Sequence, residues 1–88
     1  MTINQKFVVY LMSSYLYYVE NVHVLSDIDF DHLCKELLDN WDSITHRHKY
    51  LVTKGDLEAG TGFAIKYPQI VIGAARRWYR DNTPDRST

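Results

Sequence analysis

Two stretches with apolar residues at helical spacing lie close together in the first half of the chain and limit its fold. The first, about 4–20, carries Phe7, Tyr10, Leu11, Ser14, Tyr17 and Tyr18 on one stripe, although the β-branched and aromatic run 7–11 leaves a strand open. The second, about 27–40, carries Phe30, Leu33, Leu37 and Trp41. Ser26 with Asp29 three residues later predicts a capping box at the start of this helix, with the shorter carboxylate of Asp in place of Glu. Because six residues connect the two stretches, we expect an antiparallel helical hairpin.

The second half of the chain predicts shorter elements. Thr53 and Asp56 form a second capping pair before a brief helix, which the Gly-Thr-Gly sequence at 60–62 ends. We expect extended backbone at 63–65 and a short helix or turn within 42–52.

A final helix is expected over about 68–80. Pro68 suits its first position, where the missing N–H costs nothing. Trp41 and Trp78 are expected to be largely buried, whereas residues 81–88 contain no large apolar side chain and should form a flexible tail. The 88-residue chain therefore predicts one mainly α, small helical domain over 1–80.

The composition points to a cytoplasmic protein without metal or membrane. The single cysteine, Cys34, has no internal disulfide partner and no cysteine–histidine spacing fits a zinc site. The apolar run 7–12 leads into Tyr15 without a cleavage pattern, so a signal peptide is not expected. No stretch approaches the ~20 apolar residues of a membrane span. The net charge of −1 gives no general attraction to nucleic acid.

The residues with most chemical meaning gather around the turn of the expected hairpin. Residues 15–33 read YLYYVENVHVLSDIDFDHL. This stretch resembles the N-terminal (Ia) domain of NAD-dependent DNA ligases, and residues 34–37 resemble it less closely. The family pattern is an aromatic pair, a short loop, Ser or Pro, Asp, any residue, Glu, Tyr, Asp, any residue and Leu. In that family the module is a helical hairpin that holds the nicotinamide mononucleotide (NMN) half of NAD.

The resemblance implies roles for individual residues. Tyr17 and Tyr18 would be the aromatic pair and Asp27 and Asp31 the acidic pair, while Phe30 stands where the family has tyrosine. It implies NAD or NMN as the ligand. The chain departs from ligases in lacking the Lys-x-Asp-Gly adenylation motif, so we expect no enzymatic activity.

The chemistry of these residues fits the same ligand. The nicotinamide ring is flat and cationic and suits tyrosine faces, and two carboxylates can accept hydrogen bonds from ribose hydroxyls. The competing interpretation is that Asp27 only favours the first turn of its helix and that Asp31 is solvated.

Three further groups of residues carry side chains that could form a site. The first group is on one face of the final helix and consists of Arg76, Arg77 and Arg80. This face is either solvated or a partner-binding contact to phosphate or an acidic protein. Three arginines are too few for sequence-specific DNA binding. His46 and His48 lack a third metal ligand. Cys34 lies near Asp31 on the same helix, and the negative charge of that carboxylate disfavours the thiolate form of the cysteine.

Two functions remain open. One is a non-catalytic module that recognises the nicotinamide or NMN part of NAD, as an accessory to a ligase or a sensor. The other is a small interaction protein, of the kind that phages encode, which binds or inhibits a protein partner and uses the hairpin as a scaffold.

Overall fold

The computed structural model describes residues 1–62 and 64–82. These residues form four α-helices: α1 (Ile3–Tyr18), α2 (Asp27–Asp39), α3 (Lys54–Ala59) and α4 (Gln69–Asn82). Two single-turn 3₁₀ helices, Trp41–Ser43 and Lys49–Leu51, lie between α2 and α3. The described residues contain no strand, so the predicted mainly α class is confirmed, including a helix over 7–11. No described helix is long and apolar enough to cross a membrane.

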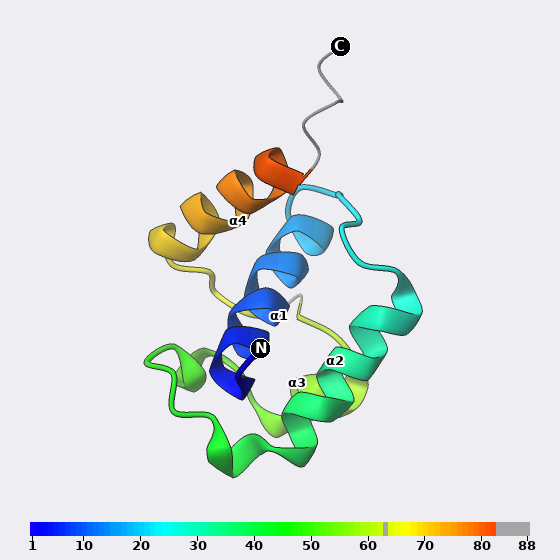
Figure 1. Cartoon of the computed structure of the whole chain (residues 1–88), viewed down its shortest axis with the longest axis vertical. Helices are drawn as coiled ribbons and strands as arrows, with labels where there is room; N and C mark the ends of the chain where they lie inside the picture. The colour runs from blue at the N-terminus through cyan, green and yellow to red at the C-terminus, as the bar shows by residue number, and fades with distance from the viewer. Residues whose placement is uncertain (63, 83–88) are drawn as a thin grey trace.

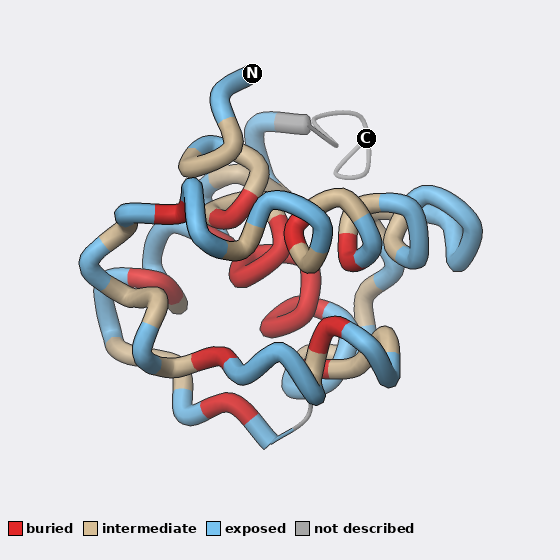
Figure 2. The backbone as a smooth tube through the Cα atoms, turned by 90° about the horizontal axis from the view of Figure 1, so that it is seen from below, coloured by how far each residue is buried: buried red, intermediate tan, exposed pale blue. Residues whose placement is uncertain are grey.

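α1 is the central helix of the domain (Figure 1). It packs against α2 on one side and α4 on the other, and α2 also packs on α3. α1 and α2 run in opposite directions, as the hairpin prediction requires (Figure 1). The buried segments turn toward the middle of the molecule and the exposed segments outward (Figure 2). One hydrophobic cluster fills the space between α1, α2 and α3, and a second lies between α1 and α4.

Local capping defines both helices of the hairpin. Thr2 and Gln5 form a reciprocal capping box that starts α1. α1 ends at Tyr18, and Asn21 in the following loop adopts a left-handed conformation with φ of 57°, which asparagine tolerates better than most residues. The predicted N-cap Ser26 is confirmed, because its hydroxyl accepts a hydrogen bond from the Asp29 N–H at 3.1 Å. The capping box is only half formed, since among the described residues the Asp29 carboxylate makes no return bond to the Ser26 N–H.

The segment after α2 is fixed by a second capping box and a close backbone approach. Thr53 and Asp56 cap α3 reciprocally, as predicted, and Gly60 ends it with φ of +68°. Gly62 then lies so close to α1 that a Cβ atom on it would be 2.7 Å from Ser14 Cβ. Glycine is therefore required at 62 by the close approach to α1 and at 60 by the backbone angle.

The extended backbone expected at 63–65 is not what the structure shows for its described part. Ala64 lies in a turn, and the Ile65 N–H donates to the Gly62 carbonyl at 3.2 Å. Phe63 lies outside the described residues. Gly60 and Gly62 allow the chain to reverse direction, and this turn outweighs the β propensity of the apolar residues that follow.

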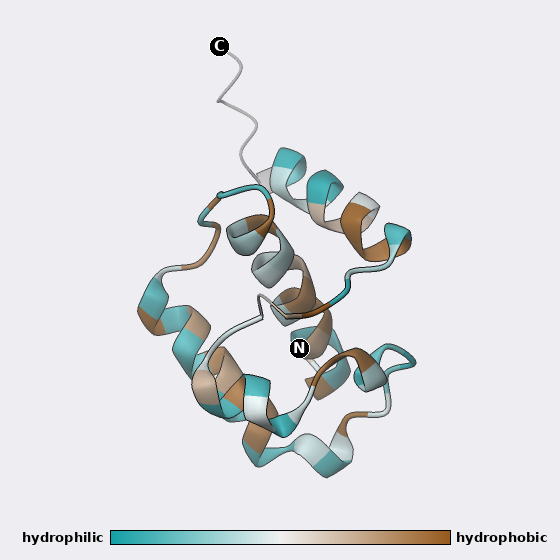
Figure 3. Ribbon diagram, turned by 180° about the vertical axis from the view of Figure 1, so that it is seen from behind, coloured by the Kyte–Doolittle hydropathy of each residue, from teal (hydrophilic) through white to brown (hydrophobic). Residues whose placement is uncertain are grey.

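α4 begins one residue after the predicted start. The Pro68 carbonyl accepts hydrogen bonds from the N–H groups of Val71 and Ile72, so proline precedes the first helical residue. The hydrophobic first turns of α4 pass into a hydrophilic end (Figure 3). Of the predicted tail 81–88, Asp81 and Asn82 belong to α4, and residues 83–88 lie outside the described part.

The two tryptophans, expected to be largely buried, pack against the core, and each keeps part of its surface exposed. Trp41 lies in a 3₁₀ turn after α2, with Lys49 Nζ 4.7 Å from its ring centroid. Trp78 lies on α4, which packs along only one side of α1 (Figure 1). Both rings therefore cover the edge of the core.

Candidate functional site

A single cleft collects the five residues that the sequence singled out for ligand binding. Its volume is about 260 Å³. The end of α1, the start of α2 and the end of α3 contribute its lining residues, which are Tyr17, Tyr18, Asp27, Phe30, Asp31, Ala59 and Gly60. We call it the tyrosine–aspartate cleft. The hairpin spacing thus places the aromatic and acidic residues on one surface.

The two tyrosines meet edge to face. Their ring centroids are 4.6 Å apart at an interplanar angle of 76°, and their residues are 38% and 36% exposed. The rings therefore offer a corner of two perpendicular aromatic surfaces to a ligand. Burial raises the pKa of the Tyr18 phenol, and Tyr17 beside it acts in the same direction. The Tyr18 hydroxyl therefore keeps its proton at neutral pH.

The two carboxylates differ in their surroundings. Asp31 forms an ion pair with Lys35 one turn along α2, with 3.1 Å between Oδ2 and Nζ, and both side chains are well exposed. Asp27 lies in the first turn of α2 and is exposed, and no ion pair joins it to the described residues. The positive end of the helix dipole favours the negative charge of Asp27. The acidic pair thus keeps acceptor oxygens accessible from solvent.

Phe30, which forms the floor of the cleft, is supported by the buried Tyr10. The Phe30 ring stacks on Tyr10, with centroids 5.7 Å apart and planes 22° from parallel. The fully buried Tyr10 donates its hydroxyl proton to the Thr61 carbonyl at 2.7 Å. Tyr10 therefore ties the floor of the cleft to the segment that follows α3.

The third wall of the cleft, formed by Ala59 and Gly60 at the end of α3 beside the walls from α1 and α2, was not predicted. The sequence marked 60–62 only as a chain reversal, yet Gly60 lies against Asp31, where a Cβ on the glycine would be 3.7 Å from Oδ1. His23 was also missed; its ring meets Tyr17 edge-on at 4.4 Å. It borders a hollow of only about 30 Å³ that shares Tyr17, Asp27 and Phe30 with the cleft. Only the three-dimensional packing of α3 and the loop reveals these neighbours.

The three arginines line one shallow groove on α4, as their spacing indicated, but they are not equivalent. Arg76 Nε donates to Glu20 Oε2 at 2.6 Å, and the Tyr15 hydroxyl donates to the same oxygen at 2.5 Å. The bonds from Tyr15 and then Arg76 lower the pKa of Glu20. Arg76 therefore joins α4 to the end of α1, whereas Arg77 and Arg80 are exposed.

The remaining candidates do not form a metal or nucleophile site. No group of three histidine, cysteine or acidic side chains suited to a metal occurs in 1–62 or 64–82. Cys34 is fully buried, and this burial, followed by the charge of Asp31, raises its thiol pKa to about 12. The expectation that its thiolate is disfavoured agrees with this environment.

Comparisons of the chain with protein-family models, with curated proteins and with solved structures find no match.

Proposed function

We propose that this protein is a non-catalytic module that binds the nicotinamide mononucleotide end of NAD, or NMN itself, in the tyrosine–aspartate cleft. The observation that carries the proposal is the convergence of Tyr17, Tyr18, Asp27, Phe30 and Asp31 on that cleft. The resemblance of residues 15–37 to the NMN-binding domain of NAD-dependent ligases supports the same ligand. The protein would act as an accessory to a ligase or as a sensor of the nucleotide.

The cleft suits the ligand in chemistry and in size. The cationic nicotinamide ring lies against the tyrosine faces by stacking and cation–π attraction. The ribose hydroxyls donate to Asp27 and Asp31. At about 260 Å³ the cleft is just below the roughly 300 Å³ at which small-molecule sites begin, so it holds the mononucleotide in part. We expect micromolar or weaker affinity, because much of the ligand stays in contact with water.

The absence of catalysis is part of the proposal. Lys54, the lysine of the Lys-Gly-Asp sequence, is exposed at the start of α3, and Asp56 is engaged in capping the Thr53 N–H. Neither residue borders the tyrosine–aspartate cleft. Incubation with NAD and nicked DNA should therefore give neither adenylated protein nor sealed DNA.

Calorimetric titration of the whole chain with NMN, NAD and nicotinamide tests the proposal. The double variant Asp27→Asn/Asp31→Asn should lose about 2–4 kcal/mol of NMN binding through two charge-assisted hydrogen bonds, or about 30- to 700-fold in affinity. Asp29→Asn is the matched control, because it removes an exposed charge from the same first turn of α2 outside the cleft. A flat titration of the wild-type protein at millimolar NMN, or equal losses in both variants, would refute it.

A second candidate is an interaction protein that binds an acidic partner through α4. It is favoured by the groove in which exposed Arg77 and Arg80 flank apolar surface, including Ile70. In that case Arg77→Glu/Arg80→Glu abolishes complex formation and Asp27→Asn/Asp31→Asn does not. Arg76 is left unchanged in this test because its bond to Glu20 joins α4 to α1.

A further inference from the structure

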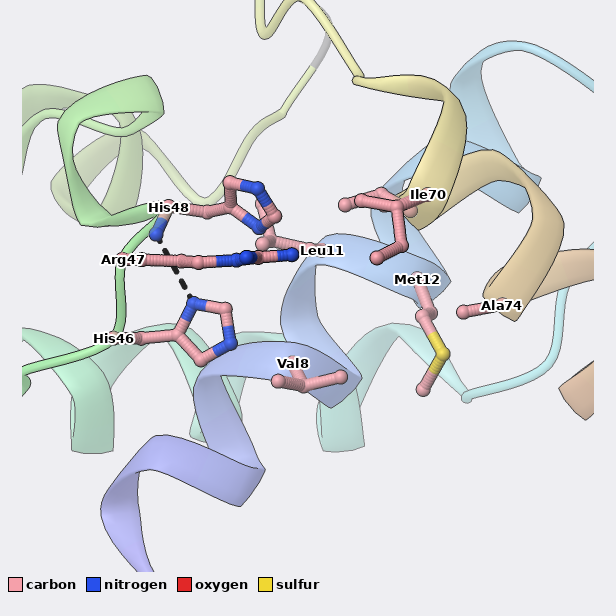
Figure 4. A pocket seen from close by; sticks show the side chains of 9 residues that line it. Val8, Leu11, Met12, His46, Arg47, His48, Ile70 and Ala74 are labelled. Atoms are coloured by element: carbon pink, nitrogen blue, oxygen red, sulfur yellow. Dashed lines mark hydrogen bonds between the residues drawn. The ribbon is translucent and has the colours of Figure 1, made fainter.

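A second pocket lies where α1, the beginning of α4 and the loop 46–48 meet (Figure 4). Its volume is about 130 Å³. Its apolar wall consists of Val8, Leu11, Met12, Ile70, Val71 and Ala74. Its rim consists of His46, Arg47 and His48. We call it the basic-rimmed pocket; it shares no lining residue with the tyrosine–aspartate cleft.

The apolar wall fits one ring or a short branched chain. An apolar protein cavity of about 150 Å³ is large enough to hold benzene. The basic-rimmed pocket, at about 130 Å³, is close to that size. A dinucleotide or a long chain does not fit in it.

The rim carries the positive charge of Arg47 and the hydrogen-bonding groups of two histidines. The Arg47 side chain extends from the loop toward Leu11 on α1 (Figure 4). Among the residues the structure describes, none forms an ion pair with Arg47, and none of those lining the pocket is acidic. The guanidinium therefore presents unpaired donors beside an apolar surface.

The loop itself holds His46 in a defined state. Its Nδ1 accepts the His48 N–H at 3.1 Å, so the neutral ring carries its proton on Nε2. Burial, and then the charges of His48 and Arg47, lower the pKa of His46. The ring packs against Phe7 at 5.6 Å between centroids, which fixes its orientation. His46 Nε2–H is a second donor beside Arg47.

We propose that the basic-rimmed pocket binds a monocarboxylate whose apolar part is one ring or a short branched chain. The carboxylate pairs with the Arg47 fork, assisted by His46, and the apolar part lies between α1 and α4. Such a carboxylate is either a free small acid or the C-terminal residue of a peptide. This site is independent of the nicotinamide proposal, since its ligand, elements and residues differ.

Titration of the whole chain with phenylacetate, followed in two-dimensional amide NMR spectra, tests the site. We expect saturable shifts around residues 46–48 and 70–74, and binding at least tenfold weaker for the uncharged isostere phenylacetamide. Arg47→Gln should weaken phenylacetate binding about tenfold or more, because it removes a charge-assisted pair. Lys54→Gln, which removes one exposed positive charge elsewhere, should leave binding unchanged.

Two further arms complete the test. Ala74→Phe, a change at an exposed helical position that fills the pocket, should abolish binding while the melting temperature stays near that of the wild type. N-acetylphenylalanine compared with phenylacetate distinguishes a peptide C-terminus from a free acid, and tighter binding of either supports the site. The proposal is overturned if neither carboxylate shifts these residues at millimolar concentration, or if Arg47→Gln binds like the wild type.

Discussion

The close contact between Gly62 and α1 allows a sharp test of how the third wall of the tyrosine–aspartate cleft is positioned. A Cβ at residue 62 would lie 2.7 Å from both Ser14 Cβ and Ser14 Oγ. The hydroxyl can rotate away, but Ser14 Cβ is bonded directly to the backbone of the central helix. Gly62→Ala must therefore displace the loop or α1, and overpacking of this kind costs about 2 kcal/mol.

Thermal unfolding of Gly62→Ala measures that cost. In a domain of this size 1 kcal/mol corresponds to about 4–8 °C, so the melting temperature should fall by about 8–16 °C. Gly73→Ala is the matched control, because Gly73 is exposed within α4 and a Cβ there meets nothing within 4 Å. This control should gain about 0.5–1 kcal/mol from helix propensity.

A double-mutant cycle separates the clash from other effects of the alanine. Ser14→Gly removes both clashing atoms at a cost of about 1 kcal/mol as a helical glycine. Combined with Gly62→Ala it should therefore destabilise less than the sum of the two single changes. If Gly62→Ala melts at or above the wild-type temperature, the loop does not lie against α1 as described.

Three further predictions concern groups around the core. Tyr10→Phe leaves the Thr61 carbonyl without its hydroxyl partner and should cost about 1–2 kcal/mol in denaturant unfolding. The Cys34 pKa is raised to about 12 in the folded state, so the unfolded state loses the thiol proton at lower pH. The free energy of unfolding should therefore fall as the pH rises above about 9, and Cys34→Ala should reduce this pH dependence. The bonds from Tyr15 and then Arg76 lower the Glu20 pKa, so the stabilisation by Glu20 is present above the unfolded pKa and is lost on acidification through the folded pKa. Glu20→Gln should therefore flatten the stability curve below about pH 5, and an unchanged acid limb would contradict a role for these two bonds.

The hairpin and the convergence of the five candidate residues on one cleft were predictable because they depend on local chemistry. Helical spacing and the Ser26 cap fix the start of α2, and the short connection brings the tyrosines near Asp27 and Asp31. These signals act over a few residues, so a single sequence contains them. The same logic placed α3 through Thr53 and Asp56.

The remaining features depend on contacts between distant parts of the chain. Tyr10 bonds to Thr61 across 51 positions, and this contact brings α3 to the cleft. The basic-rimmed pocket needs α1, the loop 46–48 and α4 together. The half-buried state of Trp78 follows from α4 packing along one side of α1 only. No local pattern contains this information.

The most direct test of the central claim is a two-dimensional amide NMR titration of the whole chain with NMN. We expect saturable shifts confined to the ends of α1 and α3 and the start of α2, including Tyr17, Tyr18, Asp27, Asp31 and Gly60. An affinity in the micromolar to millimolar range agrees with a cleft of this size. Unchanged spectra at millimolar NMN, or shifts confined to the groove on α4, would contradict the claim.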